Sequence, residues 1–327
     1  MAKILDGTIK ELTDNKIDID RDGSQTARAR ASRDNLVDNI INLAKNPGSK
    51  IPLLFKGKEK LYFGSFARST KIQPLDDIDI MICFSAQGCT YDNEASPLCH
   101  TITNKHRPAE LKPMFENDDT LNSAKLLNAL KSSLSGLSDY EQADIHRRQE
   151  AVTLKLKSYP WNFDIVPCFH TVHDTYLIPD GKGKWKATDP RIDQNRITSI
   201  NKKLDNKVIP IIRTMKYWKK QKLSKFEDQI SSYMFETMIL DYYYSVSSLD
   251  ASISRNIVYL FSYLENAIKK PVNDPKGFQG DMNGLNAEGR KEVRGILYRS
   301  RKMLYDATML EMERKTTETM NLLSFVF

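Results

Sequence analysis

Two stretches of the chain decide its fold: Phe63-Gly64-Ser65-Phe66-Ala67-Arg68 and, after a short connector, Asp77-Ile78-Asp79-Ile80-Met81-Ile82. Side chains alternate between faces along a strand, so Asp77 and Asp79 are predicted to share one face, with Ile78 turned into the core. Two carboxylates on one face suit Mg²⁺, a hard ion that takes oxygen ligands and keeps waters and substrate phosphates. Gly64 lets a ligand approach the backbone, and the Ser65 hydroxyl and nearby N–H groups are predicted to contact the outer phosphates of a nucleoside triphosphate.

A plainer interpretation of the same residues is available. Gly-Ser is a common turn dipeptide, and the acidic run from 76 to 79 would also suit a solvated turn that opens a buried strand. Either motif alone is weak evidence, because short motifs recur by chance. Their combination, with an apolar strand on each side, favours a functional site.

A two-metal site needs a third carboxylate, and Asp164 is the candidate. Alternating residues from 152 to 157, a turn at 159–160 and a second run from 161 to 166 predict a hairpin. Asp164 points away from its apolar neighbours in that second strand, which would bring it beside Asp77 and Asp79. The alternative for a single Asp in a strand is an exposed edge position.

The ordered set of motifs resembles a known family. Gly64-Ser65, Asp77-x-Asp79 and Asp164 resemble the DNA polymerase β-like nucleotidyltransferases. Two downstream segments resemble helical-lobe motifs of cyclic GMP-AMP synthase and 2′-5′ oligoadenylate synthetase: Arg213-Thr214-Met215-Lys216-Tyr217-Trp218-Lys219 and Ser231-Ser232-Tyr233-Met234-Phe235-Glu236. With Asn273-Asp274-Pro275, the stretch from about residue 25 to 310 is similar to the bacterial CD-NTases, the second-messenger synthases of CBASS anti-phage systems.

The fold that this resemblance implies is α+β, with a mixed sheet in a nucleotidyltransferase lobe packed against a C-terminal helical lobe. We expect the catalytic lobe over residues 1–194, including a long helix at 26–44 that spans both lobes in related enzymes, and the helical lobe over 195–327. Apolar spacing predicts a further helix near 120–134, after a polar insertion at about 87–118. The apolar stripe from 204 to 218 predicts helix, with Pro210 as a kink or restart.

Four residues of the helical lobe are candidates for nucleotide binding. The resemblance makes Lys216 a ligand of the donor triphosphate and Tyr233 a platform that stacks on the donor base. Ser231 and Ser232 lie where a helix is predicted to start, and a helix N-terminus attracts anions. The alternatives are a solvated Lys216, an N-cap role for either serine and a core position for Tyr233.

The mechanism expected from these residues is metal-assisted nucleotidyl transfer. One Mg²⁺ on Asp77 and Asp79 would stabilise the leaving pyrophosphate, and a second, shared with Asp164, would lower the pKa of an acceptor ribose hydroxyl. Asp164 is also placed to accept the proton, and Mn²⁺ is expected to substitute for Mg²⁺. Repetition and ring closure would yield a cyclic di- or trinucleotide from ATP, alone or with another NTP, and cyclic tri-AMP is the favoured example.

Composition agrees with this class of enzyme. The chain has 327 residues, of which 40% are hydrophobic, enough for a substantial core. Its 49 Lys and Arg against 42 Asp and Glu give a net charge of +7, which suits a phosphate-bearing partner. A charged N-terminus and the lack of a run of about 18 apolar residues predict a soluble, cytoplasmic protein without a membrane partner. The four cysteines have no Cys-x-x-Cys spacing, so structural disulfides are not expected.

Other hypotheses remain open at this point. A linear oligoadenylate synthetase or a small-molecule nucleotidyltransferase would share the metal site, and a nucleic-acid sensor would need a nucleic-acid activator. Some relatives depend on a HORMA-domain regulatory partner, which the sequence neither shows nor excludes. A calcium loop at 18–29 is disfavoured because Ala29 stands where a bidentate Glu is required. The basic residues from 290 to 302 are interpreted as a solvated helix face, and the apolar C-terminus as a segment that packs on the core.

Overall fold

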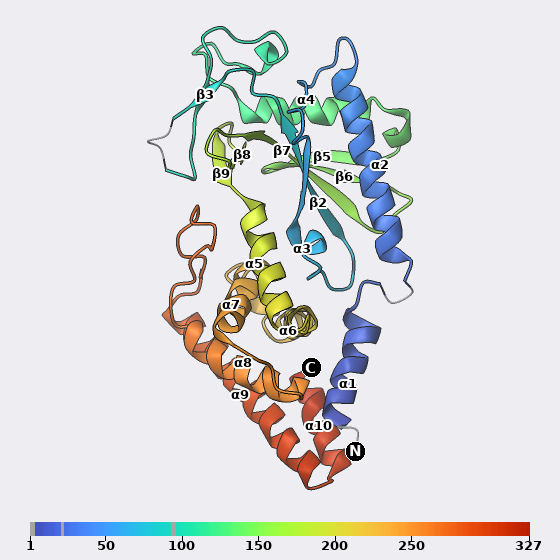
Figure 1. The fold of residues 1–327 in the computed structure, drawn as a ribbon, viewed down its shortest axis with the longest axis vertical. Coiled ribbons are helices and arrows are strands. Elements are labelled where there is room, and N and C mark those ends of the chain that lie inside the picture. The colour runs from blue at the N-terminus through green and yellow to red at the C-terminus, as the bar shows by residue number, and fades with distance from the viewer. Residues whose placement is uncertain (1–3, 21–22, 93–95) are drawn as a thin grey trace. The chain divides into compact units, whose positions relative to one another are not determined.

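The structure is a computed structural model that describes residues 4–20, 23–92 and 96–327 (Figure 1). Contacts divide the chain into two compact units. The sheet unit comprises Asp22–Arg68 and Pro74–Gln194, and the helical unit comprises Met1–Arg21, Ser69–Gln73 and Asn195–Phe327, so far as the structure describes them. The composition of the two units confirms the α+β class.

A mixed sheet of seven strands forms the centre of the sheet unit. Its two longest strands, β2 (Asp77–Phe84) and β7 (Asn162–His170), run parallel, and every other strand pairs antiparallel with its neighbour. The main order is β1-β2-β7-β6-β5, with β8 paired to the end of β7 and β9 paired to β8. The remaining bounds are β1 Lys60–Phe63, β5 Asp144–Arg148, β6 Ala151–Lys155, β8 Tyr176–Pro179 and β9 Trp185–Thr188.

Burial along β2 explains why this strand is central. From Ile80 to Phe84 every side chain is buried, whereas Asp77 and Asp79 at its start are only half-buried. A strand covered on both faces carries a continuous apolar run, so the polar residues gather at the end where cover is incomplete. The half-buried polar side chains of β2 are therefore concentrated where the strand begins.

Two helices of the sheet unit match the expected ones closely. The helix expected at 26–44 is α2 (Gln25–Lys45), and the one expected near 120–134 is α4 (Ser123–Ser135). The later start of α4 has a local cause, because the Asn122 side chain accepts the Ala124 N–H at 2.8 Å and so caps the helix there. All of α2 belongs to the sheet unit.

The polar insertion expected at about 87–118 contains short elements where it is described. These are β3 (Thr90–Tyr91), β4 (Ile102–Thr103) and the 3₁₀ turn η2 (Lys112–Met114), and a further 3₁₀ turn, η3 (Ser138–Tyr140), follows α4. Residues 93–95 lie outside the described part of the chain.

The helical unit is built around Trp218. Its ring stacks near Phe235 and meets Phe261 edge-on, and its Nε1 donates to Ser300 Oγ at 3.0 Å. The predicted restart at Pro210 is confirmed, because one helix ends at Lys203 and the next carries this proline in its first turn. The elements are α1 (Ile4–Leu12), η1 (Thr13–Ile17), α5 (Pro190–Lys203), α6 (Val208–Lys222), η4 (Ser224–Phe226), α7 (Ser232–Ser245), α8 (Ile253–Ala267), α9 (Ala287–Met312) and α10 (Thr316–Val326).

The division into units differs from the predicted domains in two places. Residues 1–194 were expected to form one lobe, but the contacts assign the described residues 4–20, and residues 69–73, to the helical unit. The reason is packing: Leu5 and Ile9 of α1 are fully buried in the helical core. The sequence of a short amphipathic helix shows that one face is buried, but it does not show which core that face packs against.

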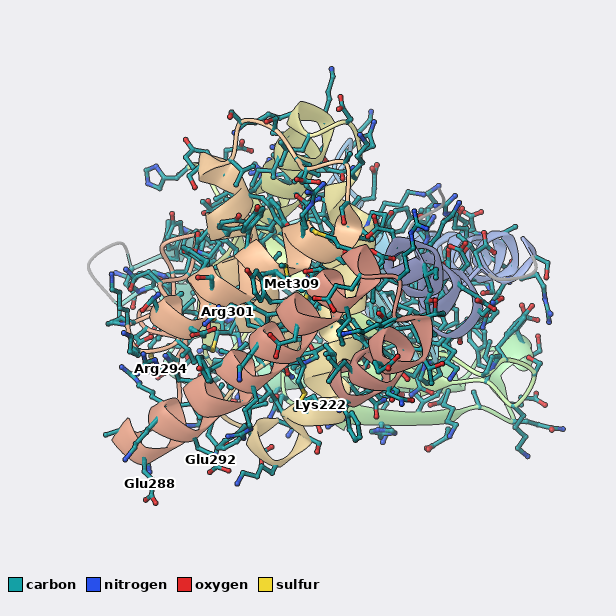
Figure 2. The ribbon with its side chains drawn as sticks, turned by 90° about the horizontal axis from the view of Figure 1, so that it is seen from below. Lys222, Glu288, Glu292, Arg294, Arg301 and Met309 are labelled. Carbon is teal, nitrogen blue, oxygen red and sulfur yellow. The ribbon has the colours of Figure 1, made fainter. Side chains whose placement is uncertain are left out.

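Two surface predictions concern the end of the chain. The apolar C-terminus packs as expected, since Leu323 and Val326 of α10 are buried. Figure 2 shows Glu288, Glu292, Arg294 and Arg301 on α9, so this helix carries both acidic and basic side chains. Arg301 is not simply solvated, because it donates to Glu265 at 2.5 Å. Among the described residues, every helix falls short of the length and apolarity required to cross a bilayer.

The docking of α1 yields a test of the helical core. Asp6 Oδ1 accepts hydrogen bonds from Ser252 Oγ, Ser254 Oγ and the Ser254 N–H, each at 2.9 Å. Asp6→Ala is expected to lower the free energy of unfolding by about 1–3 kcal/mol, because three donors at the start of α8 lose a charged acceptor. Glu11→Ala, at an exposed position of the same helix, is the control. Equal urea midpoints for the two variants would contradict this role of Asp6.

Candidate active site

The pairing of β2 with β7 brings the predicted carboxylates together. The two strands are parallel and in register, with Asp79 opposite Asp164 and Asp77 opposite Asn162. Residues opposite one another on neighbouring strands point to the same face, as do residues two apart on one strand. All three aspartates therefore lie on one face of the sheet, and all are half-buried.

The hairpin prediction that placed Asp164 is confirmed. Strands β6 and β7 pair antiparallel, and β7 lies between β2 and β6, inside the sheet. The alternative of an exposed edge position for Asp164 is therefore wrong.

The turn after β1 packs directly on this face. Gly64 has φ +74°, and a Cβ placed on it would overlap the carboxylate of Asp79. Phe63, the residue before it, is the register partner of Asp79. Two features therefore require glycine at this position. Its positive φ disfavours other residues, and the Asp79 carboxylate fills the space that a side chain would need. Ser65 follows in the short helix α3 (Gly64–Ala67) and is half-buried.

Thr153 holds Asp164 and was missed by the sequence prediction. Its Oγ1 donates to Asp164 Oδ1 at 2.6 Å from the opposite position on β6. The donated bond fixes the orientation of the carboxylate. The predicted hairpin did not specify its register, so no signal in the sequence identified which residue would face Asp164.

The donor set of this face suits a hard cation. Carboxylate oxygens are the ligands that Mg²⁺ and Mn²⁺ prefer. The Asp79 carboxylate fills the space beside Gly64. In the part of the chain that the structure describes, no group of three or more His, Cys, Asp and Glu side chains is spaced as a complete metal site. The three aspartates alone therefore do not make a complete metal site, and an ion held by them would take its remaining ligands from substrate phosphates and water, as Mg²⁺ commonly does.

Lys216 occupies a buried place in the helical unit. It lies on α6 with 7% of its surface exposed, and its Nζ donates to the Thr70 carbonyl at 2.9 Å. The Glu236 carboxylate lies 3.7 Å from the same ammonium. The alternative of a solvated lysine is therefore wrong. Contact of Lys216 with a triphosphate stays a prediction.

The two serines occupy different positions at the start of α7. Ser231 is the N-cap, and its Oγ accepts the Met234 N–H at 3.0 Å, as the capping alternative expected. Ser232 is the first residue of the helix and is exposed. The first N–H groups of a helix and its positive dipole end favour an anion.

Tyr233 is fixed by a loop after α8. Its hydroxyl donates to Asp274 Oδ1 at 3.0 Å, and the Lys276 ammonium lies 4.0 Å from the ring centroid. Burial alone raises the pKa of Asp274, but the charge of Lys276 and hydrogen bonds from the Gln279 and Lys276 backbone outweigh it, so the net pKa is lowered. Since folding lowers this pKa, ionised Asp274 stabilises the fold above its ordinary value of 3.8, and the gain is lost in more acidic solution.

Comparison with known proteins agrees with this geometry. A probable cyclic nucleotide synthase of Bacillus cereus (strain VD146) is 43% identical over 276 residues, covering 83% of this chain and 81% of the relative. The chain belongs to the bacterial CD-NTase family. It is a nucleotidyltransferase, and residues 99–201 match the Second Messenger Oligonucleotide or Dinucleotide Synthetase domain.

More distant relatives extend the comparison. A cyclic AMP-AMP-AMP synthase of Acinetobacter sp. (strain ATCC 27244 / 9458) is 25% identical over 139 residues, covering 41% of this chain and 37% of the relative. Two solved structures of the CdnC protein of E. coli MS115-1 share the fold. The complex of CdnC with HORMA-deltaN has a TM-score of 0.70 at 14% identity and covers 98% of this chain and 97% of that one. CdnC with ATP has a TM-score of 0.69 at 13% identity and covers 97% and 96%. The DNA polymerase β-like fold of this CD-NTase is thus confirmed.

A glycine pair tests the contact between the turn and Asp79. Gly64→Ala is expected to abolish most nucleotidyl transfer, because displacing Asp79 by about 1 Å costs about 100-fold in rate. Gly57→Ala is the matched control, since Gly57 has φ +84° but open space around its Cα. Both substitutions carry the cost of a left-handed alanine, about 1–2 kcal/mol, so the two melting temperatures should fall. Only Gly64→Ala should lose activity in a radiolabelled NTP assay, and equal activity of the two would contradict the contact.

Proposed function

We propose that this CD-NTase joins ATP, alone or with another NTP, into a cyclic oligonucleotide second messenger that acts in antiviral defence of the CBASS type. One observation carries the proposal: Asp77, Asp79 and Asp164 share one face of the sheet beside the Gly64 turn. The similarity to a probable cyclic nucleotide synthase over most of the chain supports the cyclic product.

The three aspartates are proposed to bind two Mg²⁺ ions, with Mn²⁺ as a substitute. Asp77 and Asp79 would hold one ion, and Asp164 would share the second. Such ions supply positive charge to the reacting phosphate and to the leaving pyrophosphate. The donor chemistry of the face supports this assignment.

The proton of the acceptor hydroxyl is proposed to go to Asp164. In the reaction, the hydroxyl oxygen forms a bond to the α-phosphorus, the bond from that phosphorus to the pyrophosphate oxygen breaks, and the proton leaves the hydroxyl. Thr153 occupies Oδ1 of Asp164 with a donated hydrogen bond. The second carboxylate oxygen, Oδ2, is therefore the assigned proton acceptor.

The residues proposed to bind the donor nucleotide are those that the family resemblance assigns. The Gly64 and Ser65 backbone, the Lys216 ammonium and the start of α7 at Ser232 would bind its triphosphate. Tyr233 would stack on its base. The Lys276 ammonium already lies over the Tyr233 ring at 4.0 Å, so the base is assigned to the opposite face of that ring.

The identity of the product and of the partner is proposed from relatives. The Acinetobacter relative is named a cyclic AMP-AMP-AMP synthase, which favours an adenine-containing product such as cyclic tri-AMP. The CdnC structure with HORMA-deltaN favours a HORMA-domain regulatory partner.

Product analysis tests the reaction class. Purified protein incubated with each NTP and Mg²⁺ or Mn²⁺ is expected to yield a species that mass spectrometry identifies as cyclic and that phosphatase leaves unchanged. EDTA should stop its formation. A product that loses terminal phosphate would instead indicate a linear oligoadenylate or a small-molecule nucleotidyltransferase.

A double substitution tests the aspartates. Asp77→Asn with Asp79→Asn should abolish NTP consumption, because an amide replaces each anionic metal ligand while the side-chain shape is kept. The melting temperature should stay close to that of the wild type. Asp38→Asn, at an exposed position of α2, controls for loss of one charge in the same unit. Continued ATP consumption by the double variant would refute the assignment.

A further inference from the structure

A five-residue connector links the two parts of the candidate active site. Ser69–Gln73 follows the Gly64-Ser65 turn and precedes the strand that carries Asp77 and Asp79. Its neighbours in sequence belong to the sheet unit, yet its own contacts place it in the helical unit. The connector is therefore a part of the helical unit that is joined covalently to the Gly64-Ser65 turn on one side and to the strand of Asp77 and Asp79 on the other.

The start of the connector is held by α6 and α7. Arg213 Nε donates to the Ser69 carbonyl at 2.8 Å, and Ser69 has φ +60°, an uncommon conformation for a residue other than glycine. Lys216 Nζ donates to the Thr70 carbonyl at 2.9 Å. The Thr70 hydroxyl donates to Glu236 Oε2 at 2.8 Å.

The end of the connector is held by the N-terminal segment. The Gln73 N–H donates to the Ile17 carbonyl, and Gln73 Nε2 donates to the Asp18 carbonyl, both at 3.0 Å. Arg213 also contacts Asp18, with Nη1 at 3.3 Å from Oδ1. Hydrogen bonds thus fix both ends of the connector, and Arg213 contacts both Ser69 and the N-terminal segment that holds Gln73.

Glu236 is the least expected member of this group. Only 2% of its surface is exposed, beside Thr70 at 0% and Lys216 at 7%. Burying a carboxylate is costly unless it is paired and hydrogen-bonded, and an apolar side chain at this helix position would avoid the cost. Glu236 meets the condition through the hydroxyl of Thr70 and the charge of Lys216. Such a group is better explained by the geometry it fixes than by stability.

We propose that Glu236 is a positioning residue for nucleotidyl transfer. Together with Thr70 and Lys216 it fixes the position of the connector. Because only a few residues join the connector to the turn before it and to the aspartates after it, fixing the connector also restricts where they lie. Lys216 then has two tasks, because an ammonium carries three donors and one of them is directed to Thr70. The consequence for catalysis rests on the proposed function, whereas the clamping of the connector does not.

Substitutions at Thr70 and Glu236 separate charge from hydrogen bonding. Thr70→Val removes the hydroxyl and keeps the shape, and Thr70→Ser keeps the hydroxyl. Glu236→Gln keeps an acceptor for Thr70 but removes the charge beside Lys216. Thr319→Val is the matched control, since Thr319 of α10 is fully buried and its hydroxyl donates to Lys315 within the same segment.

Two measurements test these variants: the turnover number kcat and amide hydrogen exchange. With melting temperatures well above that of the assay, Thr70→Val is expected to lower kcat by about tenfold, the equivalent of one charge-assisted hydrogen bond, and Glu236→Gln, which keeps a neutral acceptor, should lower kcat by less. Thr70→Ser should restore kcat, and Thr319→Val should leave it unchanged. Without nucleotide, amide hydrogen exchange over residues 69–76 should be faster in Thr70→Val than in wild type.

The outcomes distinguish this inference from the proposed function. Wild-type exchange and wild-type kcat in Thr70→Val would overturn the positioning role while leaving the function intact. A wild-type protein that joins no nucleotides would overturn the function, and faster exchange in Thr70→Val would still support the clamp.

Discussion

The in-register pairing of β2 with β7 is the constraint on which the rest of the structure depends. It sets Asp79 beside Asp164 and turns both carboxylates to one face. Like charges on neighbouring strands oppose folding, so a sheet that gathers three of them breaks a local rule of stability. Sites of this kind are expected where function requires them, and a divalent cation would convert the repulsion into coordination.

The surrounding structure serves this arrangement in specific ways. Gly64 leaves room for the Asp79 carboxylate, and Thr153 orients Asp164 through a bond of 2.6 Å. The apolar run of β2 buries the strand on both faces and leaves only its first residues for chemistry. In the helical unit, a buried Lys216 and Glu236 hold the connector between the two motifs proposed to be catalytic. Specificity of geometry, more than stability, is the common purpose of these contacts.

Sequence patterns predicted what depends on local rules. Strand alternation placed Asp77 and Asp79 on one face, and in the predicted hairpin it turned Asp164 away from its apolar neighbours, because these outcomes follow from a period of two. Pairing partners across the chain could not be predicted in this way. Nothing in the local sequence showed that Thr153 faces Asp164, that Glu236 reaches Thr70, or that α1 packs in the helical core. Lys216 illustrates the limit, since a basic run suggests solvent exposure but the structure buries both Lys216 and Lys219.

The central claim is that the shared face of Asp77, Asp79 and Asp164 is a metal site for nucleotidyl transfer. Its most direct test is a crystal structure with Mn²⁺ and a non-hydrolysable ATP analogue, with the metal located by anomalous scattering. We predict Mn²⁺ peaks bound by Asp77 and Asp79, with Asp164 among the ligands of one of them. Well-ordered nucleotide with Mn²⁺ bound elsewhere, away from all three carboxylates, would contradict the account.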